Sequence, residues 1–132
     1  MMRKALPLMV LALMIVLPGV VRADTKLFDL QRMVVAVAVE EREPVGAGDL
    51  FAADLENIYA FIEAREIRRD TEVTMVWSRN GQEVSRVSLA VRQGPRWRTF
   101  SSITLANRAG DWRVELLDET GASLRSLDFH VR

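Results

Sequence analysis

Residues 71–91 read TEVTMVWSRNGQEVSRVSLAV, a stretch with the pattern of one β-hairpin. Every second residue from 73 to 77 is apolar, which is the period of a half-buried strand. Asn80-Gly81 follows, a dipeptide favoured in two-residue type I′ turns because both central positions need a positive φ. Apolar residues alternate again from 87 to 91. Since an isolated hairpin is only marginally stable, other segments must cover its apolar face.

Five further segments have strand character. Residues 32–39 (RMVVAVAV) are β-branched or small on both faces, which predicts a strand that is covered on both sides or at one edge. The other four are residues 57–64, 96–103, 111–118 and 123–131. With the two hairpin strands they give about seven short strands at regular spacing. This pattern predicts an all-β antiparallel sandwich.

Residues 49–67 have a second interpretation. Their apolar side chains fall near helical spacing behind a possible cap at Asp49, which favours a helix. Residues 57–64 (NIYAFIEA) are nevertheless rich in β-branched and aromatic side chains, as in a fully buried strand. The periodicity alone leaves helix and strand open. Residues 44–48, with one proline and two glycines, predict a loop.

The first 23 residues predict a signal peptide. Arg3 and Lys4 precede an uninterrupted apolar run of ten residues, 8–17, and small side chains lead up to Ala23. Because a membrane-spanning helix needs about 20 residues, we expect cleavage after Ala23 and release to the periplasm. The alternative is an uncleaved segment that anchors the chain to the inner membrane.

The amino-acid composition limits the classes of partner that the protein can bind. The sequence has 18 Lys plus Arg and 18 Asp plus Glu, and three of the basic residues precede position 24, so the remainder has a net charge of −3. Such a mixed surface argues against nucleic-acid binding and against binding to anionic membranes. The absence of cysteine excludes disulfides and thiolate chemistry.

Three runs in this order suggest a family: residues 74–81 (TMVWSRNG), 97–102 (WRTFSS) and 110–115 (GDWRVE). Together they resemble a bacterial family known as domain of unknown function 2914, which is found in exported or membrane-attached proteins. The resemblance covers roughly residues 44–131 and implies an all-β domain of immunoglobulin-like type, in which residues 57–64 are a strand. Family members often carry a histidine two residues before the hairpin tryptophan, where this sequence has Met75. No activity is attached to the family.

A second similarity concerns the sixth strand of immunoglobulin domains, which begins with Gly-x-Tyr and has a cysteine two places later. Gly110, Trp112 and Val114 stand in that arrangement, with tryptophan for tyrosine and valine for cysteine. Trp77 matches the buried tryptophan of the third strand. With the inward-facing Phe129 of the last strand, these parallels predict a core built on Trp77, Trp112, Val114 and Phe129.

We expect residues 24–43 to hold a lead-in and the first strand, and residues 44–132 to form an immunoglobulin-like domain. The first strand is expected to belong to this same domain.

The three tryptophans also suggest a platform on which sugar rings could stack. For Trp77 and Trp112, which have aliphatic neighbours at strand spacing, burial is the favoured interpretation. For Trp97 the alternation leaves core and surface equally open.

Arginines beside these tryptophans are candidates for binding a phosphate or carboxylate. Arg96 and Arg98 flank one tryptophan and Arg113 follows another. The favoured interpretation is that they stack on rings or pair with carboxylates such as Glu115 and Asp111. The predicted ligand-binding set is nevertheless Arg96, Trp97, Arg98 and Arg113.

Catalysis finds little support in the sequence. His130 is the only histidine, and with Asp128 on the same predicted face it could act as a base. No Gly-x-Ser-x-Gly motif accompanies it, so a solvated position is favoured. Glu40, Glu41 and Glu43 suggest paired carboxylates for hydrolysis, but a charge run at a strand end is usually a solvated turn. We therefore predict that the protein is not an enzyme and has no catalytic residue, metal or cofactor.

The predicted function is a non-catalytic exported module that binds an unknown protein or cell-envelope component through a strand edge or loops. The alternative is a carbohydrate- or anion-binding domain that uses Trp97 and its flanking arginines. A concavity with exposed Trp97 would favour this alternative, and a pocket joining His130 to several carboxylates would favour an enzyme. Flat polar faces with an unpaired edge strand would favour the binding module.

Overall fold

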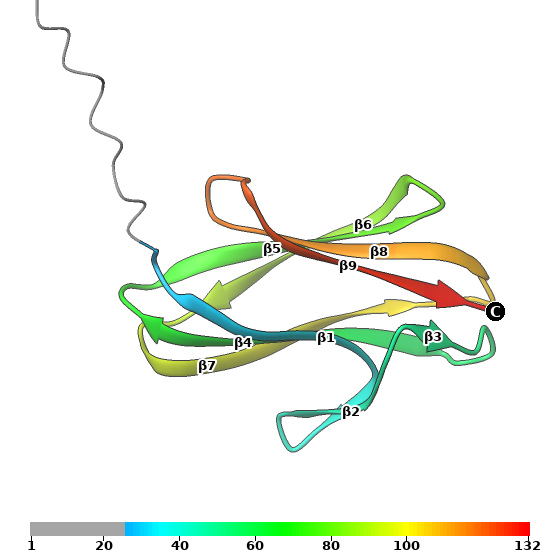
Figure 1. Cartoon of the computed structure of the whole chain (residues 1–132), viewed down its shortest axis with the longest axis horizontal. Helices are drawn as coiled ribbons and strands as arrows, with labels where there is room; N and C mark the ends of the chain where they lie inside the picture. The colour runs from blue at the N-terminus through cyan, green and yellow to red at the C-terminus, as the bar shows by residue number, and fades with distance from the viewer. Residues whose placement is uncertain (1–25) are drawn as a thin grey trace, which may run out of the picture.

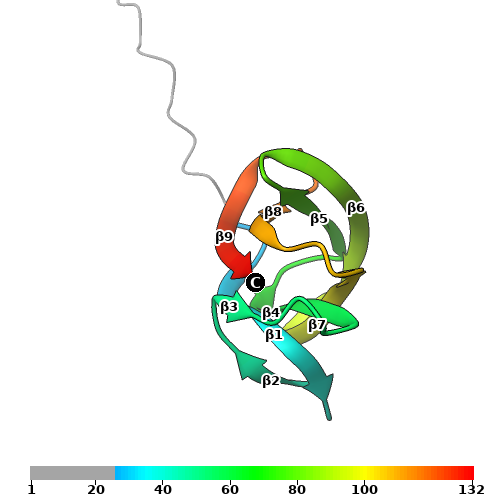
Figure 2. The ribbon, with the colours of Figure 1, turned by 90° about the vertical axis from the view of Figure 1, so that its right-hand side faces the viewer.

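The computed structural model describes residues 26–132, which form two β-sheets packed face to face (Figures 1 and 2). The predicted all-β immunoglobulin-like sandwich is confirmed, with nine strands in place of about seven. The strands are β1 Asp29–Glu40, β2 Glu43–Ala47, β3 Leu50–Phe51, β4 Asn57–Ile67, β5 Thr71–Arg79, β6 Gln82–Val91, β7 Gly94–Thr104, β8 Gly110–Leu117 and β9 Ser123–Val131. The predicted signal peptide, residues 1–23, lies outside the described residues. None of the described residues belongs to a helix with the length and hydropathy of a membrane span.

The order of the strands defines the type of sandwich. The four-stranded sheet has the order β2-β1-β4-β7, and the five-stranded sheet has the order β3-β9-β8-β5-β6. Strands β1, β4 and β7 correspond to A, B and E of an immunoglobulin domain, and β9, β8 and β5 correspond to G, F and C. Strand β6 pairs with β5, so none of residues 26–132 fills the position beside β7 that strand D fills in a constant-type domain. Strands β6 and β7 are thus edges on the same side of the molecule (Figure 2).

The hairpin of β5 and β6 forms as predicted. Asn80 has a φ of 48° and Gly81 a φ of 82°, which are the positive angles of a type I′ turn. The side-chain oxygen of Asn80 accepts a hydrogen bond from the backbone N–H of Asp111 at 2.9 Å, which ties the turn to β8. A register shift between Trp77 and Ser78 marks a bulge close to the turn.

Residues 49–67 contain strands β3 and β4 and no helix. In β4 the residues Ile58, Ala60 and Ile62 are fully buried between the sheets, while Phe61 and Glu63 are buried on the opposite face. Because both faces of β4 are covered, its sequence lacks the polar alternation of a half-buried strand. This absence explains why the apolar residues mimic helical spacing.

Trp77 lies at the centre of the core and is fully buried. Its indole N–H donates to the hydroxyl of Ser101 at 3.1 Å, and that hydroxyl donates to the sulfur of Met75 at 3.0 Å. The indole N–H of Trp77 and the hydroxyl of Ser101 thus have their hydrogen-bond partners within the core. All four residues expected in the core are at most 1% exposed: Trp77, Trp112, Val114 and Phe129.

Trp112 occupies the place of the tyrosine in the immunoglobulin corner. Its ring stacks on Phe129 with centroids 6.0 Å apart, and its indole N–H donates to the carbonyl of Arg108 at 2.9 Å. The tyrosine of an immunoglobulin domain bonds back to the chain in the same way. An indole therefore replaces the phenol here, and Val114 fills the space of the absent cysteine.

The hairpin of β1 and β2 leaves the sandwich and folds back beneath the four-stranded sheet (Figures 1 and 2). The loop predicted at residues 44–48 is therefore mostly strand, because β2 pairs with β1 despite its proline and glycine. Gly46 has a φ of 67°, and a Cβ there would lie 2.6 Å from the Val37 side chain. Glycine thus lets the two strands approach closely at this point.

Candidate functional site

The predicted ligand-binding residues lie on three surfaces. Arg96 and Arg98 point outward from the four-stranded sheet, since they pair in register with the outward-facing Arg65 and Glu63. Trp97 points inward between them and packs against the core, half-buried. Its indole N–H is buried and has no hydrogen-bond partner among the described residues. Trp97 therefore does not share a surface with the two arginines.

Arg113 belongs to the five-stranded sheet, where its guanidinium binds Asp128 on β9 at 2.7 Å. Cross-strand pairing of this arginine was the favoured prediction, but its partner is Asp128, and not Glu115 or Asp111.

Four arginines meet two glutamates on the outer face of the four-stranded sheet. We call this group the arginine cluster: Arg32 of β1, Arg65 of β4, Arg96 and Arg98 of β7, with Glu43 of β2 and Glu63 of β4. Arg65 binds Glu63 at 2.8 Å. Arg32 bridges Glu43 at 2.9 Å and Glu63 at 3.3 Å. Arg98 binds Glu43 at 2.6 Å. The glutamates thus hold three strands and the folded-back hairpin together.

Both glutamates of the arginine cluster are held in the charged form. Burial alone would raise the pKa of Glu63, but the hydrogen bond from Arg65 and the charges of Arg65, Arg96 and Arg32 outweigh it, so the pKa is lowered. The pKa of Glu43 is lowered chiefly by its hydrogen bond from Arg32, opposed by desolvation and supported by the bond from Arg98.

Positive charge exceeds negative charge in the arginine cluster. Four arginines face two glutamates, and counting Asp29, which is opposite Arg65 in the ladder, one positive charge still remains. Arg96 is exposed and forms no ion pair with any of residues 26–132, so its charge is the one most accessible to a ligand.

Aromatic rings accompany these charges. The guanidinium of Arg32 lies 4.9 Å from the centroid of Phe61, and Phe61 is only 1% exposed beneath it. Tyr59 and Phe100 form an edge-to-face pair at 5.8 Å, and Phe100 is 44% exposed. An outward face that combines arginine with aromatic side chains has the composition of protein-binding hot spots.

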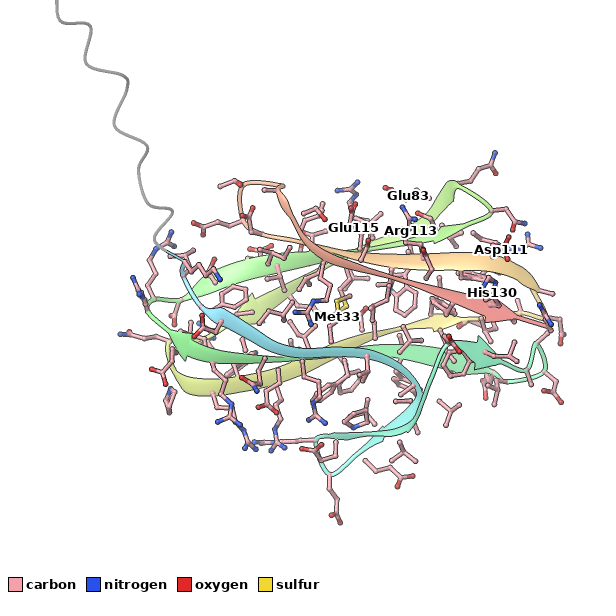
Figure 3. The ribbon with its side chains drawn as sticks, in the orientation of Figure 1. Met33, Glu83, Asp111, Arg113, Glu115 and His130 are labelled. Atoms are coloured by element: carbon pink, nitrogen blue, oxygen red, sulfur yellow. The ribbon has the colours of Figure 1, made fainter. Side chains whose placement is uncertain are left out.

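The opposite outer face offers a shallow hollow of about 510 Å³ over β5, β8 and β9. His130 binds Asp111 across the strands at 2.8 Å, and Figure 3 shows the two side chains together. Ser78 also lines the hollow, but β8 separates its strand from that of His130, and no hydrogen bond joins them in the described chain. Asp128 is engaged by Arg113. The hollow therefore joins His130 to carboxylates without aligning a nucleophile.

No group of three or more histidine, aspartate or glutamate side chains in residues 26–132 is arranged to hold a metal ion.

The fold and these two faces define an immunoglobulin-like β-sandwich domain. Residues 70–131 match the family described as "Protein of unknown function (DUF2914)", which confirms the resemblance to that family over this part of the chain. The part of the resemblance before residue 70 stays a prediction. A search of the curated proteins found no match.

Similar solved structures are parts of much longer enzymes. A beta-glucosidase from Listeria innocua in complex with glucose has a TM-score of 0.49 at 6% identity, and the match covers 79% of this chain and 16% of that one. Beta-D-glucoside glucohydrolase from Trichoderma reesei has a TM-score of 0.46 at 11% identity, with 80% and 19% covered. A beta-glucosidase from Kluyveromyces marxianus has a TM-score of 0.45 at 9% identity, with 76% and 14% covered.

Sequence reasoning missed four of the six residues in the arginine cluster. Arg32, Glu43, Glu63 and Arg65 were absent from the predicted set, and Glu43 was interpreted as part of a solvated turn. The strand interpretation of residues 57–64 would have placed Glu63 and Phe61 on one face, but the partners of Glu43 lie 11 and 55 residues away. Only the folded-back hairpin brings them together.

Proposed function

We propose that this protein is a non-catalytic binding module that acts outside the cytoplasm, after export by its N-terminal segment, on a protein or cell-envelope component. One observation carries the proposal: the long strands β6 and β7 are both unpaired on one side of the sandwich. Edge strands present free backbone N–H and C=O groups and are the usual docking sites for another chain.

The outer faces support the same function. Several charged side chains on both faces form ion pairs, such as Arg98 with Glu43 and Arg113 with Asp128, and the hollow around His130 is open and without an aligned nucleophile. Polar outer faces and free edges are features expected of a binding module.

A second candidate is an anion-binding domain, and the accessible charge of Arg96 favours it. The version of this candidate that stacks a sugar on Trp97 receives less support, because Trp97 faces the core. Titration with phosphate, acidic oligosaccharides and neutral oligosaccharides separates the two candidates. Saturable binding of a small anion that Arg96→Gln abolishes would favour the second candidate over the first.

The test of the binding module is photo-crosslinking in cells. A photoreactive amino acid is placed singly at Arg96 on β7, Ser88 on β6 and Arg125 on β9, which are all exposed. We expect one specific crosslinked product from β6 or β7 in the exported fraction and none from β9. An absence of products at all positions, or a protein that remains in the cytoplasm, would contradict the proposal.

A further inference from the structure

The free edge of β7 is the longest uninterrupted edge in residues 26–132. Its ladder with β4 runs from Gly94 to Thr104 without a register shift. The other edges are shorter or interrupted. Strand β6 contains a bulge, β2 has five residues with Pro44, and β3 has two residues. Strand β9 is paired with β3 only at residues 130–131, which leaves the shorter stretch 123–129 free. A long flat edge is an aggregation hazard unless it is protected or used. Apart from Pro95 near its start, the only features of β7 that would oppose pairing with another strand are its arginine side chains.

The space beside β7 has an apolar lining. Val87 and Leu89 of β6 point inward, since they pair with the buried Met75 and Val73, yet they are only half-buried. Trp97 of β7 is half-buried on the same inner side. All three would be covered by a strand in the empty D position, because such a strand would continue the four-stranded sheet beneath β6.

The outward side of the same space is positive. Strand β7 contributes Arg96, which has no ion pair with any of residues 26–132, and no carboxylate. Arg98, two residues further along, is already bound by Glu43 at 2.6 Å. A strand added to β7 would therefore present one set of side chains to these arginines and the other set to the apolar lining.

We infer that the edge of β7 binds an extended protein segment in which acidic residues alternate with apolar residues. The segment completes the four-stranded sheet in the D position, its carboxylates face Arg96 and Arg98, and its apolar side chains cover Val87, Leu89 and Trp97. Main-chain hydrogen bonds supply the general affinity, and the alternating pattern supplies the specificity. This inference rests on the proposed function of a binding module.

A second copy of the chain fits this edge poorly. Two antiparallel β7 strands in the register that sets Arg96 opposite Arg98 would bring arginines of the two copies together, and like charges that face each other across strands are destabilising. We therefore assign the acidic segment to a different protein.

The probes are synthetic peptides added to the folded chain from residue 24. EVEVEVE has the required alternation, KVKVKVK reverses the charge, and EEEEVVV keeps the composition without alternation. Two N-methylated forms of EVEVEVE, modified at the odd or at the even positions, remove backbone donors from one edge or the other. Calorimetric titration measures each affinity.

We expect EVEVEVE to bind at least about tenfold more tightly than KVKVKVK or EEEEVVV, and only one of the methylated forms to lose binding. Arg96→Glu should weaken binding about tenfold, since it replaces an attraction by a repulsion at a partly screened site. The matched control is Arg125→Glu, which reverses another exposed arginine, on β9, that has no ion pair with any of residues 26–132. It should leave the affinity unchanged.

Equal affinity for all peptides, no affinity for any, survival of binding in both methylated forms, or self-association of the protein in place of peptide binding would each overturn the inference. The proposed function is tested separately by the crosslinks in cells. Products from β6 together with failure of the peptides would leave a binding module whose partner uses another edge.

Discussion

On the outer face of the five-stranded sheet, polar side chains pair one to one across neighbouring strands, as Arg113 does with Asp128 and His130 with Asp111. On the outer face of the four-stranded sheet, four arginines share two glutamates, and a hairpin folds over them. Exposed one-to-one pairs contribute little to stability. The shared arrangement instead encloses Phe61 and Glu63 and still leaves positive charge beside a free edge. The charged side chains thus make one face polar, whereas on the other face they hold the folded-back hairpin against the sheet.

The largest effect that separates the faces should come from Phe61. Phe61→Ala removes a ring that is 1% exposed beneath Arg32 and the folded-back hairpin, and we expect a loss of about 3–5 kcal/mol in the free energy of unfolding. Phe100→Ala is the matched control, because Phe100 pairs with Phe61 in register but is 44% exposed, and it should cost about 1 kcal/mol. Urea denaturation measures both. Equal losses would show that the hairpin does not enclose a second apolar layer.

Removal of one carboxylate charge should have the second-largest effect on the free energy of unfolding. Glu63→Gln keeps the shape of a side chain that is 5% exposed but removes the charge that Arg65 and Arg32 bind, and we expect it to cost about 1–3 kcal/mol. Asp128→Asn makes the same change on the other face, where the exposed pair with Arg113 predicts a loss below about 1 kcal/mol. Chemical denaturation at neutral pH provides the comparison, and a larger loss for Asp128→Asn would reverse our interpretation of the two faces.

Acid should weaken the fold through the same glutamates. The pKa of Glu63 and that of Glu43 are lowered from 4.5, so their stabilisation is complete above pH 4.5 and is lost as pH falls below it toward the lowered values. In that pH range the unfolded state binds more protons than the folded state, so acid favours unfolding. Stability measured from pH 7 to pH 3 should fall less steeply for Glu63→Gln than for the native chain. Identical slopes would mean that Glu63 titrates normally.

The smallest effect should come from Trp97. Because its indole N–H is buried without a partner, Trp97→Phe removes an unsatisfied donor and should change stability by less than about 1 kcal/mol. In Trp77→Phe, a satisfied hydrogen bond to Ser101 is lost from the core, and we expect a loss of about 1–3 kcal/mol. Thermal unfolding of the two variants gives the ranking, and the opposite order would contradict a Trp97 indole N–H without a hydrogen-bond partner.

Local patterns predicted the parts of the fold that depend on neighbours in sequence. The type I′ turn at Asn80-Gly81 and the burial of Trp77 follow from spacing alone, because turn chemistry and strand alternation are local. Strand alternation did not identify β4, because both of its faces are covered and the helical spacing of its apolar residues is accidental.

The arginine cluster could be predicted only in part. Alternation places Arg96 and Arg98 on one face, and this much was predicted. The glutamate that binds Arg98 lies on a hairpin that folds back under the sheet. No local sequence pattern predicts the position that a charge run such as residues 40–43 takes in the fold. Arg113 shows the converse error, because tryptophan neighbours suggested a shared site for residues that the fold places on opposite sheets.

The most direct test of the account is a map of amide and methyl shifts in isotope-labelled protein as the EVEVEVE peptide is added. We predict that the changes concentrate on the amides of residues 96–103 and on the methyl groups of Val87 and Leu89, with slowed hydrogen exchange along β7. Changes confined to the hollow around His130, or spread without preference over both faces, would contradict the claim that the free edge beside the arginine cluster is the binding surface.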